Sequence, residues 1–192
     1  MLGNLQPRSG HRASVVPGAL WRSFLRDRDA AAAVEFGMVA MPFFGLLFAM
    51  MQTALVFWST QVLETAVANA SRDIYTEQFA TANGDTLDPA VLKARFKTRL
   101  CDEVKGLFNC AGKVDVDVQV VSDFSSASFS PPVVNKTYNA SNYGFQMPKR
   151  NEVVVVRASL EYPTFAAIGN PATTLASGNQ LIMATAAFRT EP

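Results

Sequence analysis

Residues Phe36–Leu63 read FGMVAMPFFGLLFAMMQTALVFWSTQVL, an unbroken run without a charged side chain. As a helix rising about 1.5 Å per residue, this run would be about 42 Å long, more than the roughly 30 Å hydrocarbon core of a bilayer. Up to about Leu55 it is apolar on nearly all sides, whereas a surface helix of a soluble domain shows a polar face. We therefore predict a membrane span over about residues 36–58, with Trp58 at the far interface.

The segment in front of this run is basic. Residues 1–30 hold five arginines and two aspartates, whereas the rest of the chain holds 12 Lys and Arg against 14 Asp and Glu. Because positive residues tend to stay on the cytoplasmic side of a span, we predict a cytoplasmic N-terminus and an exported body. The proline, glycine and serine of this leader, without helical or strand periodicity, are typical of a flexible segment.

Composition also limits the chemistry. The chain has 192 residues, of which 49% are hydrophobic and 17% charged, and its net charge of +1 gives no global field for nucleic acid. The one histidine, His11, lies in the leader, so the body holds no Ser–His or Cys–His pair. Two cysteines and one histidine cannot complete a zinc site, and the common glycine-rich nucleotide-binding loops are missing. We expect no enzymatic activity, no cofactor and no nucleic-acid partner.

The helix that contains the span is predicted to extend beyond it, so that one long helix covers residues 31–80. Apolar and small residues recur there at helical spacing, at Val62, Ala66, Asn69, Ala70 and Ile74. After a loop, Asp88-Pro89 indicates the start of a second, amphipathic helix, with Asp as N-cap and Pro at the first helical position. We interpret the basic run of this helix, at 93–99, as a solvated face.

Three strands are predicted in the C-terminal part. Val114–Val120 alternates apolar and polar residues, Val153–Tyr162 is β-branched as in a central strand, and Leu181–Arg189 is the third candidate. The Ser-, Asn- and Pro-rich stretch Ser122–Pro148 predicts a long exposed loop. The predicted fold class is α+β: a long N-terminal helix carries a small exported domain, residues 81–192, with an amphipathic helix on an antiparallel sheet.

Cys101 and Cys110 are separated by eight residues. In an oxidising compartment such a pair is expected to form a disulfide, which would close a small loop and stabilise the domain by about 2–3 kcal/mol. Two buried thiols are the alternative.

Glu35 directly precedes the uncharged run. A carboxylate costs about 2.5–3.5 kcal/mol near the centre of a bilayer, and less at an interface. Either Glu35 lies at headgroup level without a function, or it enters the membrane and meets a positive partner. If the chain is cut between Ala30 and Ala31, the new α-amino group of Ala31 on a neighbouring subunit is a candidate partner.

Small residues at the start of this helix fall on a four-residue spacing, interrupted by Met41, that permits close packing of helices in lipid, although such residues are common in membrane helices generally. They are Ala33, Gly37, Gly45 and Ala49. Pro42 removes one backbone hydrogen bond and predicts a kink or a local loosening of the helix.

The segment RDRDAAAAVEF at 26–36, followed by Pro42 and a Phe- and Leu-rich span, resembles the start of TadE-like proteins. These are minor pilins (pseudopilins) of bacterial tight-adherence pili. The ending ATAAFRTEP at 184–192 resembles the ending of many family members. Residues from about 81 to 180 carry no motif of the family.

This resemblance implies a bacterial inner-membrane protein with a periplasmic C-terminal domain. A prepilin peptidase would remove the leader, residues 1–30, by cutting between Ala30 and Ala31. The helix would then assemble with other pilus subunits and the inner-membrane assembly platform, and Glu35 matches the family's glutamate after the cut. Relatives usually carry Gly where this chain has Ala30, so we expect slower cleavage.

Two functions from different classes follow. The first is a structural one, a minor pilin-like component of tight-adherence pilus biogenesis. The second is a permanently anchored bitopic envelope protein whose exported domain binds another envelope protein or a surface ligand. Cleavage before Ala31 discriminates between them. A plain secretory signal is disfavoured because the apolar run exceeds the usual length of about 7–15 residues.

Overall fold

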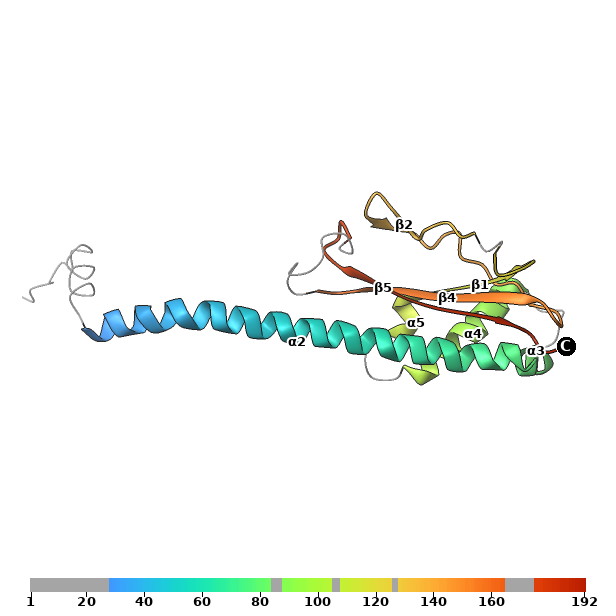
Figure 1. Ribbon diagram of the computed structural model, residues 1–192, viewed down its shortest axis with the longest axis horizontal. Coiled ribbons are helices and arrows are strands. Elements are labelled where there is room, and N and C mark those ends of the chain that lie inside the picture. Colours follow the sequence, from blue (N-terminus) through green and yellow to red (C-terminus); the bar gives the residue numbers. More distant parts are fainter. Residues whose placement is uncertain (1–27, 84–87, 105–107, 126–127, 165–174) are drawn as a thin grey trace, which may run out of the picture. The chain divides into compact units, whose positions relative to one another are not determined.

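The computed structural model describes residues 28–83, 88–104, 108–125, 128–164 and 175–192. The chain divides into two units, Met1–Phe48 and Ala49–Pro192. The long helix α2, Arg28–Tyr75, begins in the first unit, and the second unit contains its C-terminal part and a small domain of helices and strands (Figure 1). The predicted α+β fold class is confirmed. The predicted flexible leader lies outside the described residues, apart from the first turn of α2.

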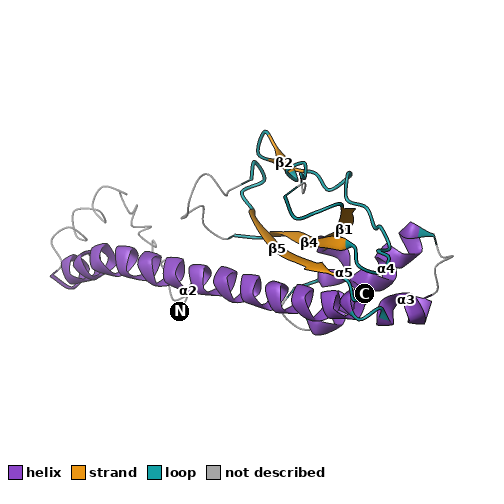
Figure 2. Cartoon of the chain, turned by 45° about the vertical axis from the view of Figure 1, so that its right-hand side comes forward, coloured by secondary structure: helices purple, strands orange, loops and turns teal. Residues whose placement is uncertain are grey.

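The domain is built on a three-stranded antiparallel sheet with the strand order β1-β4-β5 (Figure 2). Its strands are β1, Val114–Val121, β4, Val153–Tyr162, and β5, Gln180–Arg189. These are the three predicted strands, with boundaries shifted by at most one residue. The central strand β4 is buried from its first residue to Leu160, as its β-branched sequence predicts.

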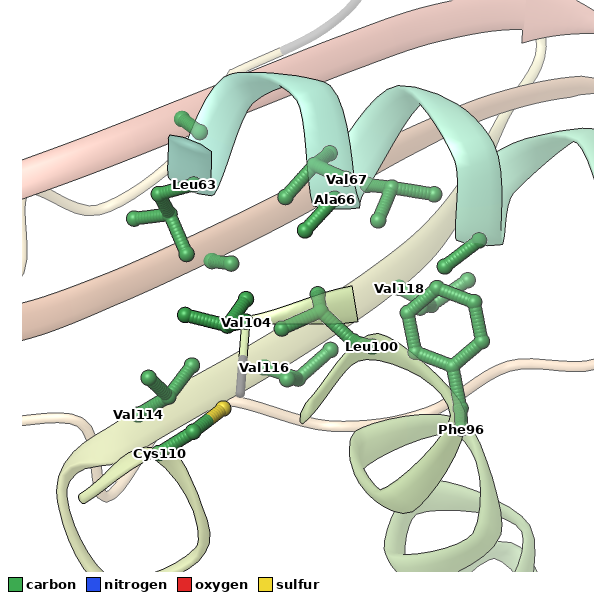
Figure 3. Packing of buried hydrophobic residues seen from close by; sticks show 14 of the residues in the cluster. Leu63, Ala66, Val67, Phe96, Leu100, Val104, Cys110, Val114, Val116 and Val118 are labelled. Carbon is green, nitrogen blue, oxygen red and sulfur yellow. The ribbon is translucent and has the colours of Figure 1, made fainter. Parts of the chain in front are cut away.

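One face of the sheet packs against helices α2 and α4, Pro89–Glu103. Figure 3 shows Leu63 and Val67 of α2 and Phe96 of α4 among the valines of β1. Alternate residues of β1 enter this core because successive side chains of a strand point to opposite faces, and Val114, Val116 and Val118 are each fully buried. The packing of an amphipathic helix on a sheet follows from this alternation in the strands and from the helical spacing of the apolar residues in α4.

The predicted continuous helix over residues 31–80 is divided in the structure. Helix α2 ends at Tyr75, and a short helix α3, Gln78–Asn83, follows. Glu77 lies between them with a φ of 57°, a left-handed conformation that terminates helices. Its carboxylate accepts hydrogen bonds from Nε of Arg150 at 3.0 and 3.3 Å and from Nη2 at 3.1 Å. Apolar periodicity alone does not reveal such a break.

Helix α4 begins as the Asp88-Pro89 pair predicts. The Asp88 carboxylate accepts a hydrogen bond of 2.8 Å from the backbone N–H of Ala90, and Pro89 occupies the first helical position. Its end carries Cys101, which forms a disulfide with Cys110 at a Cα–Cα distance of 5.4 Å. Cys110 opens α5, Cys110–Lys113, which leads directly into β1.

The expectation of a long exposed loop over Ser122–Pro148 is wrong for part of that stretch. It contains a small hairpin of β2, Val133–Val134, and β3, Thr137–Tyr138. The aromatic residues Tyr143 and Phe145 are buried, and Phe145 forms a parallel bridge with Val118 at the edge of β1. These contacts join residues far apart in sequence, so local composition could not predict them.

Candidate functional site

The first candidate site is the apolar segment of α2 between Val34 and Met51. Its large hydrophobic side chains are between 40% exposed, at Leu47, and 77% exposed, at Met41. An exposed apolar surface of this extent marks a membrane or protein interface. The residues from Ala32 to Tyr75 form a helix long and apolar enough to cross a membrane.

Glu35 lies near the start of this segment, one helical turn after Ala31. Its side chain is exposed, and among the described residues its carboxylate has no hydrogen-bond or ion-pair partner. The backbones of Ala30 and Ala31 belong to the first turn of α2, whereas their side chains lie outside the described residues. The structure therefore places the predicted cleavage bond and Glu35 on one short stretch of helix, and leaves the carboxylate accessible.

The predicted packing residues are also accessible. A Cβ atom built on Gly37 or Gly45 would meet nothing within 4 Å, so neither glycine is needed for a contact within this chain. Ala33 is exposed, Ala49 is half-buried, and α2 continues through Pro42. The small residues thus offer an open surface to which a second helix can pack closely.

Residues 30–72 match the profile of the family described as TadE-like protein. This segment is TadE-like. The match lies within α2 and begins at Ala30, the residue before the predicted cut. It supports association of the chain with tight-adherence pili and with a membrane. No curated protein and no solved structure matches the chain.

A second candidate site lies outside the TadE-like segment, on the face of the sheet opposite the helices. Asp117 of β1 and Arg157 of β4 are direct cross-strand partners, 0% and 7% exposed. The Arg157 guanidinium donates to Asp117 Oδ2 from Nε at 3.0 Å and from Nη2 at 2.5 Å. Asp117 Oδ1 accepts from the backbone N–H of Gly144 at 2.9 Å. Burial of both charges is tolerated because each is paired and hydrogen-bonded.

Two aromatic rings hold the Arg157 guanidinium. Its Cζ lies 4.4 Å from the ring centre of Phe129 and 5.1 Å from that of Tyr143. Cation–π contacts of this kind are worth about 0.5–2 kcal/mol each, more where water is excluded. The stack fastens the segment before β2 and the segment after β3 to the sheet.

A chain of hydroxyl groups continues this layer. Tyr138 donates to Asp115 Oδ2 at 2.8 Å and lies 2.9 Å from the hydroxyl of Ser159, which donates to the Tyr143 hydroxyl at 3.1 Å. Burial is the main cause that raises the pKa of both the Tyr138 and the Tyr143 phenol. Both phenols therefore stay protonated at neutral pH, and in this layer the Tyr138 hydroxyl donates to Asp115 while the Tyr143 hydroxyl accepts from Ser159.

This polar layer is not predicted by the sequence, because the aspartates of β1 look like the ordinary polar residues of an alternating strand. One signal was present, because Arg157 is the only charge within the buried run Val153–Leu160. A charge in a central strand requires a buried partner, and an acidic residue of a neighbouring strand is the natural one.

Proposed function

We propose that this chain is a minor pilin-like (pseudopilin-like) component of tight-adherence pilus biogenesis, with a structural rather than an enzymatic role. The N-terminal helix holds it in the bacterial inner membrane, where it assembles with other pilus subunits and with the assembly platform. One observation carries the proposal: the TadE-like residues 30–72 include the whole exposed apolar part of α2, from Val34 to Met51.

The leader is removed by a prepilin peptidase between Ala30 and Ala31. This bond lies in the first turn of α2, where the N–H groups have no partners within the helix and the chain unwinds at little cost. The arginines of the leader keep the N-terminus in the cytoplasm, and the domain is exported to the periplasm. The Cys101–Cys110 disulfide supports export, because disulfides persist in oxidising compartments.

Glu35 then pairs with the α-amino group of Ala31 on a neighbouring subunit. In lipid, an unpaired carboxylate and an unpaired ammonium group are both costly, so each gains by meeting the other. The small residues at 33, 37, 45 and 49 let the two helices approach closely enough for this contact. The exposed position of Glu35 is what such pairing requires.

The experiment that tests this function is the intact mass of the membrane-extracted protein, from cells with and without a prepilin peptidase. We expect a peptidase-dependent N-terminus at Ala31. An uncut chain in both strains would overturn the proposal and favour the alternative, a permanent envelope anchor whose domain binds another envelope protein or a surface ligand. Ala30→Gly serves as a sensitive variant, since Gly fits an extended chain into a tight protease cleft; we expect faster processing.

The pairing of Glu35 is tested separately by Glu35→Ala. We expect normal processing but reduced piliation and reduced crosslinking to neighbouring subunits. The matched control is Glu64→Ala, which removes an exposed glutamate of the same helix whose side chain accepts a hydrogen bond from Gln61. Normal piliation in Glu35→Ala, or an equal defect in Glu64→Ala, would refute the pairing.

A further inference from the structure

The outer polar layer of the domain contains a partly open cavity of about 210 Å³. The residues that line it include Arg157 and the rings of Phe129 and Tyr143. For comparison, an engineered protein cavity of about 150 Å³ holds one benzene molecule. The cavity therefore accommodates a ligand with one six-membered ring and its substituents.

The positive charge of Arg157, which lines this cavity, is already neutralised. Asp117 takes the Nε–H of Arg157 and one N–H of Nη2, so an anionic ligand would meet a site without net charge. Nη1 is differently placed, since its nearest acceptor is the carbonyl oxygen of Ser130 at 3.5 Å, the limit of a hydrogen bond. Arg157 thus retains N–H groups for an uncharged oxygen of a ligand.

The other lining residues, which we call the rim, supply uncharged hydrogen-bonding groups. These are the amides of Gln119, Asn139 and Asn142 and the hydroxyls of Ser128 and Ser130, and the rings of Pro131 and Pro132 lie among them. Within the described residues, the side chains of Ser128, Ser130 and Asn142 have no hydrogen-bond partner. Amides and hydroxyls both donate and accept, and therefore match hydroxyl groups that also do both.

We propose that this cavity binds a single neutral pyranose ring. The ring hydroxyls would bond to the amides and hydroxyls of the rim and to Nη1 of Arg157, while aromatic and proline surfaces cover the ring C–H groups. The lining combines two aromatic rings and two prolines with a larger number of amide and hydroxyl groups, which suits a ligand that carries several hydroxyls on a small apolar ring. The inference does not depend on the membrane or pilus role of α2, because all its residues belong to the domain.

The test is saturation-transfer NMR of the full chain, solubilised in a detergent without a sugar headgroup. The probes are the methyl glycosides of glucose, galactose, mannose and N-acetylglucosamine, together with glucuronic acid. We expect at least one neutral glycoside to bind with a Kd on the order of 1 mM, as few contacts allow. Absence of saturation transfer from every neutral glycoside, or preferential binding of glucuronic acid, would overturn the proposal.

Variants locate the binding. Asn142→Ala removes an exposed rim amide and is expected to raise the Kd at least fivefold, while Gln61→Ala removes an exposed amide of α2 and is expected to leave it unchanged. Ser130→Ala is a second rim variant whose backbone carbonyl still reaches Arg157. Unfolding transitions like that of the parent chain show that the variants are folded. If neither rim variant weakens binding, the sugar binds elsewhere and the assignment is wrong.

Discussion

The two ends of helix α2 differ in whether their apolar side chains are exposed or buried. Between Val34 and Met51 its large apolar side chains are all exposed, although the segment contains no charge after Glu35. Between Leu63 and Ile74 the pattern is reversed: the large apolar residues are buried, and charged residues lie between them. The buried residues are Leu63, Ala66, Val67, Ala70 and Ile74, each at most 3% exposed.

The difference between the two parts is the arrangement of apolar residues around the helix. In the C-terminal part they recur at i, i+3, i+4 and i+7, which places them on one stripe facing the sheet. In the N-terminal part they surround the axis, so no single protein face could cover them. A stripe predicts packing within the domain, and an apolar surface on all sides predicts lipid or other helices as the partner.

The largest expected effect comes from the same substitution at two leucines. Leu63→Ala removes a side chain that is fully buried and should lower the free energy of unfolding of the domain by about 2–5 kcal/mol. Leu47→Ala, in the exposed segment, should leave domain stability unchanged. Urea unfolding of the detergent-solubilised chain, followed by near-UV circular dichroism of the tyrosines, measures both. Equal destabilisation by the two variants would contradict the division of α2.

The reverse test places a charge in each part. Leu47→Arg puts a guanidinium near the middle of the predicted span, at a cost of about 2.5–3.5 kcal/mol on insertion scales. Thr65→Arg changes an exposed residue of the C-terminal part and should not affect insertion. Glycosylation-mapped insertion into microsomes compares the two variants. Undiminished insertion of Leu47→Arg would show that the segment around Leu47 does not determine the span.

The disulfide should matter only to the second unit. Replacing both cysteines, Cys101→Ala with Cys110→Ala, releases the short loop between α4 and α5 and should cost the domain about 2–3 kcal/mol. Membrane extraction of the helix should not change. Urea unfolding compares the variant with the oxidised parent. Identical transitions would show that the disulfide does not stabilise the domain.

Sequence reasoning succeeded where the determinants are local. The valines of β1, the β-branched run of β4 and the Asp88 cap each specify their own element through neighbours in sequence. It failed where a feature depends on distant partners. Asp117 looks solvated in its strand, and it is buried only because Arg157, 40 positions away, and Gly144, 27 positions away, come to it. The cavity on that face is built from segments that local composition identifies only as loop.

The smallest expected effect concerns the two ion pairs of Arg99, one with α2 and one within α4. Arg99 of α4 donates to Asp73 of α2 at 2.8 Å and to Glu103 at 2.7 Å. The hydrogen bond from Arg99 is the main cause that lowers the pKa of Glu103 below its usual value of 4.5. A carboxyl group whose pKa is lower in the folded state stabilises that state above its unfolded pKa, and this contribution is lost as pH falls through the folded pKa.

The domain should therefore lose a small increment of stability on acidification below about pH 4.5, beyond that expected from its other carboxylates. Arg99→Gln should remove this increment, and Glu103→Gln should remove it equally, because either change abolishes the charged hydrogen bond. Thermal unfolding at about pH 6 and about pH 3 measures the difference for the parent and both variants. Glu64→Gln, on the same helix as Asp73 and bonded to Gln61, is the control and should keep the parent's pH dependence. If Arg99→Gln retains that dependence as well, Arg99 does not hold the Glu103 carboxylate in its charged form.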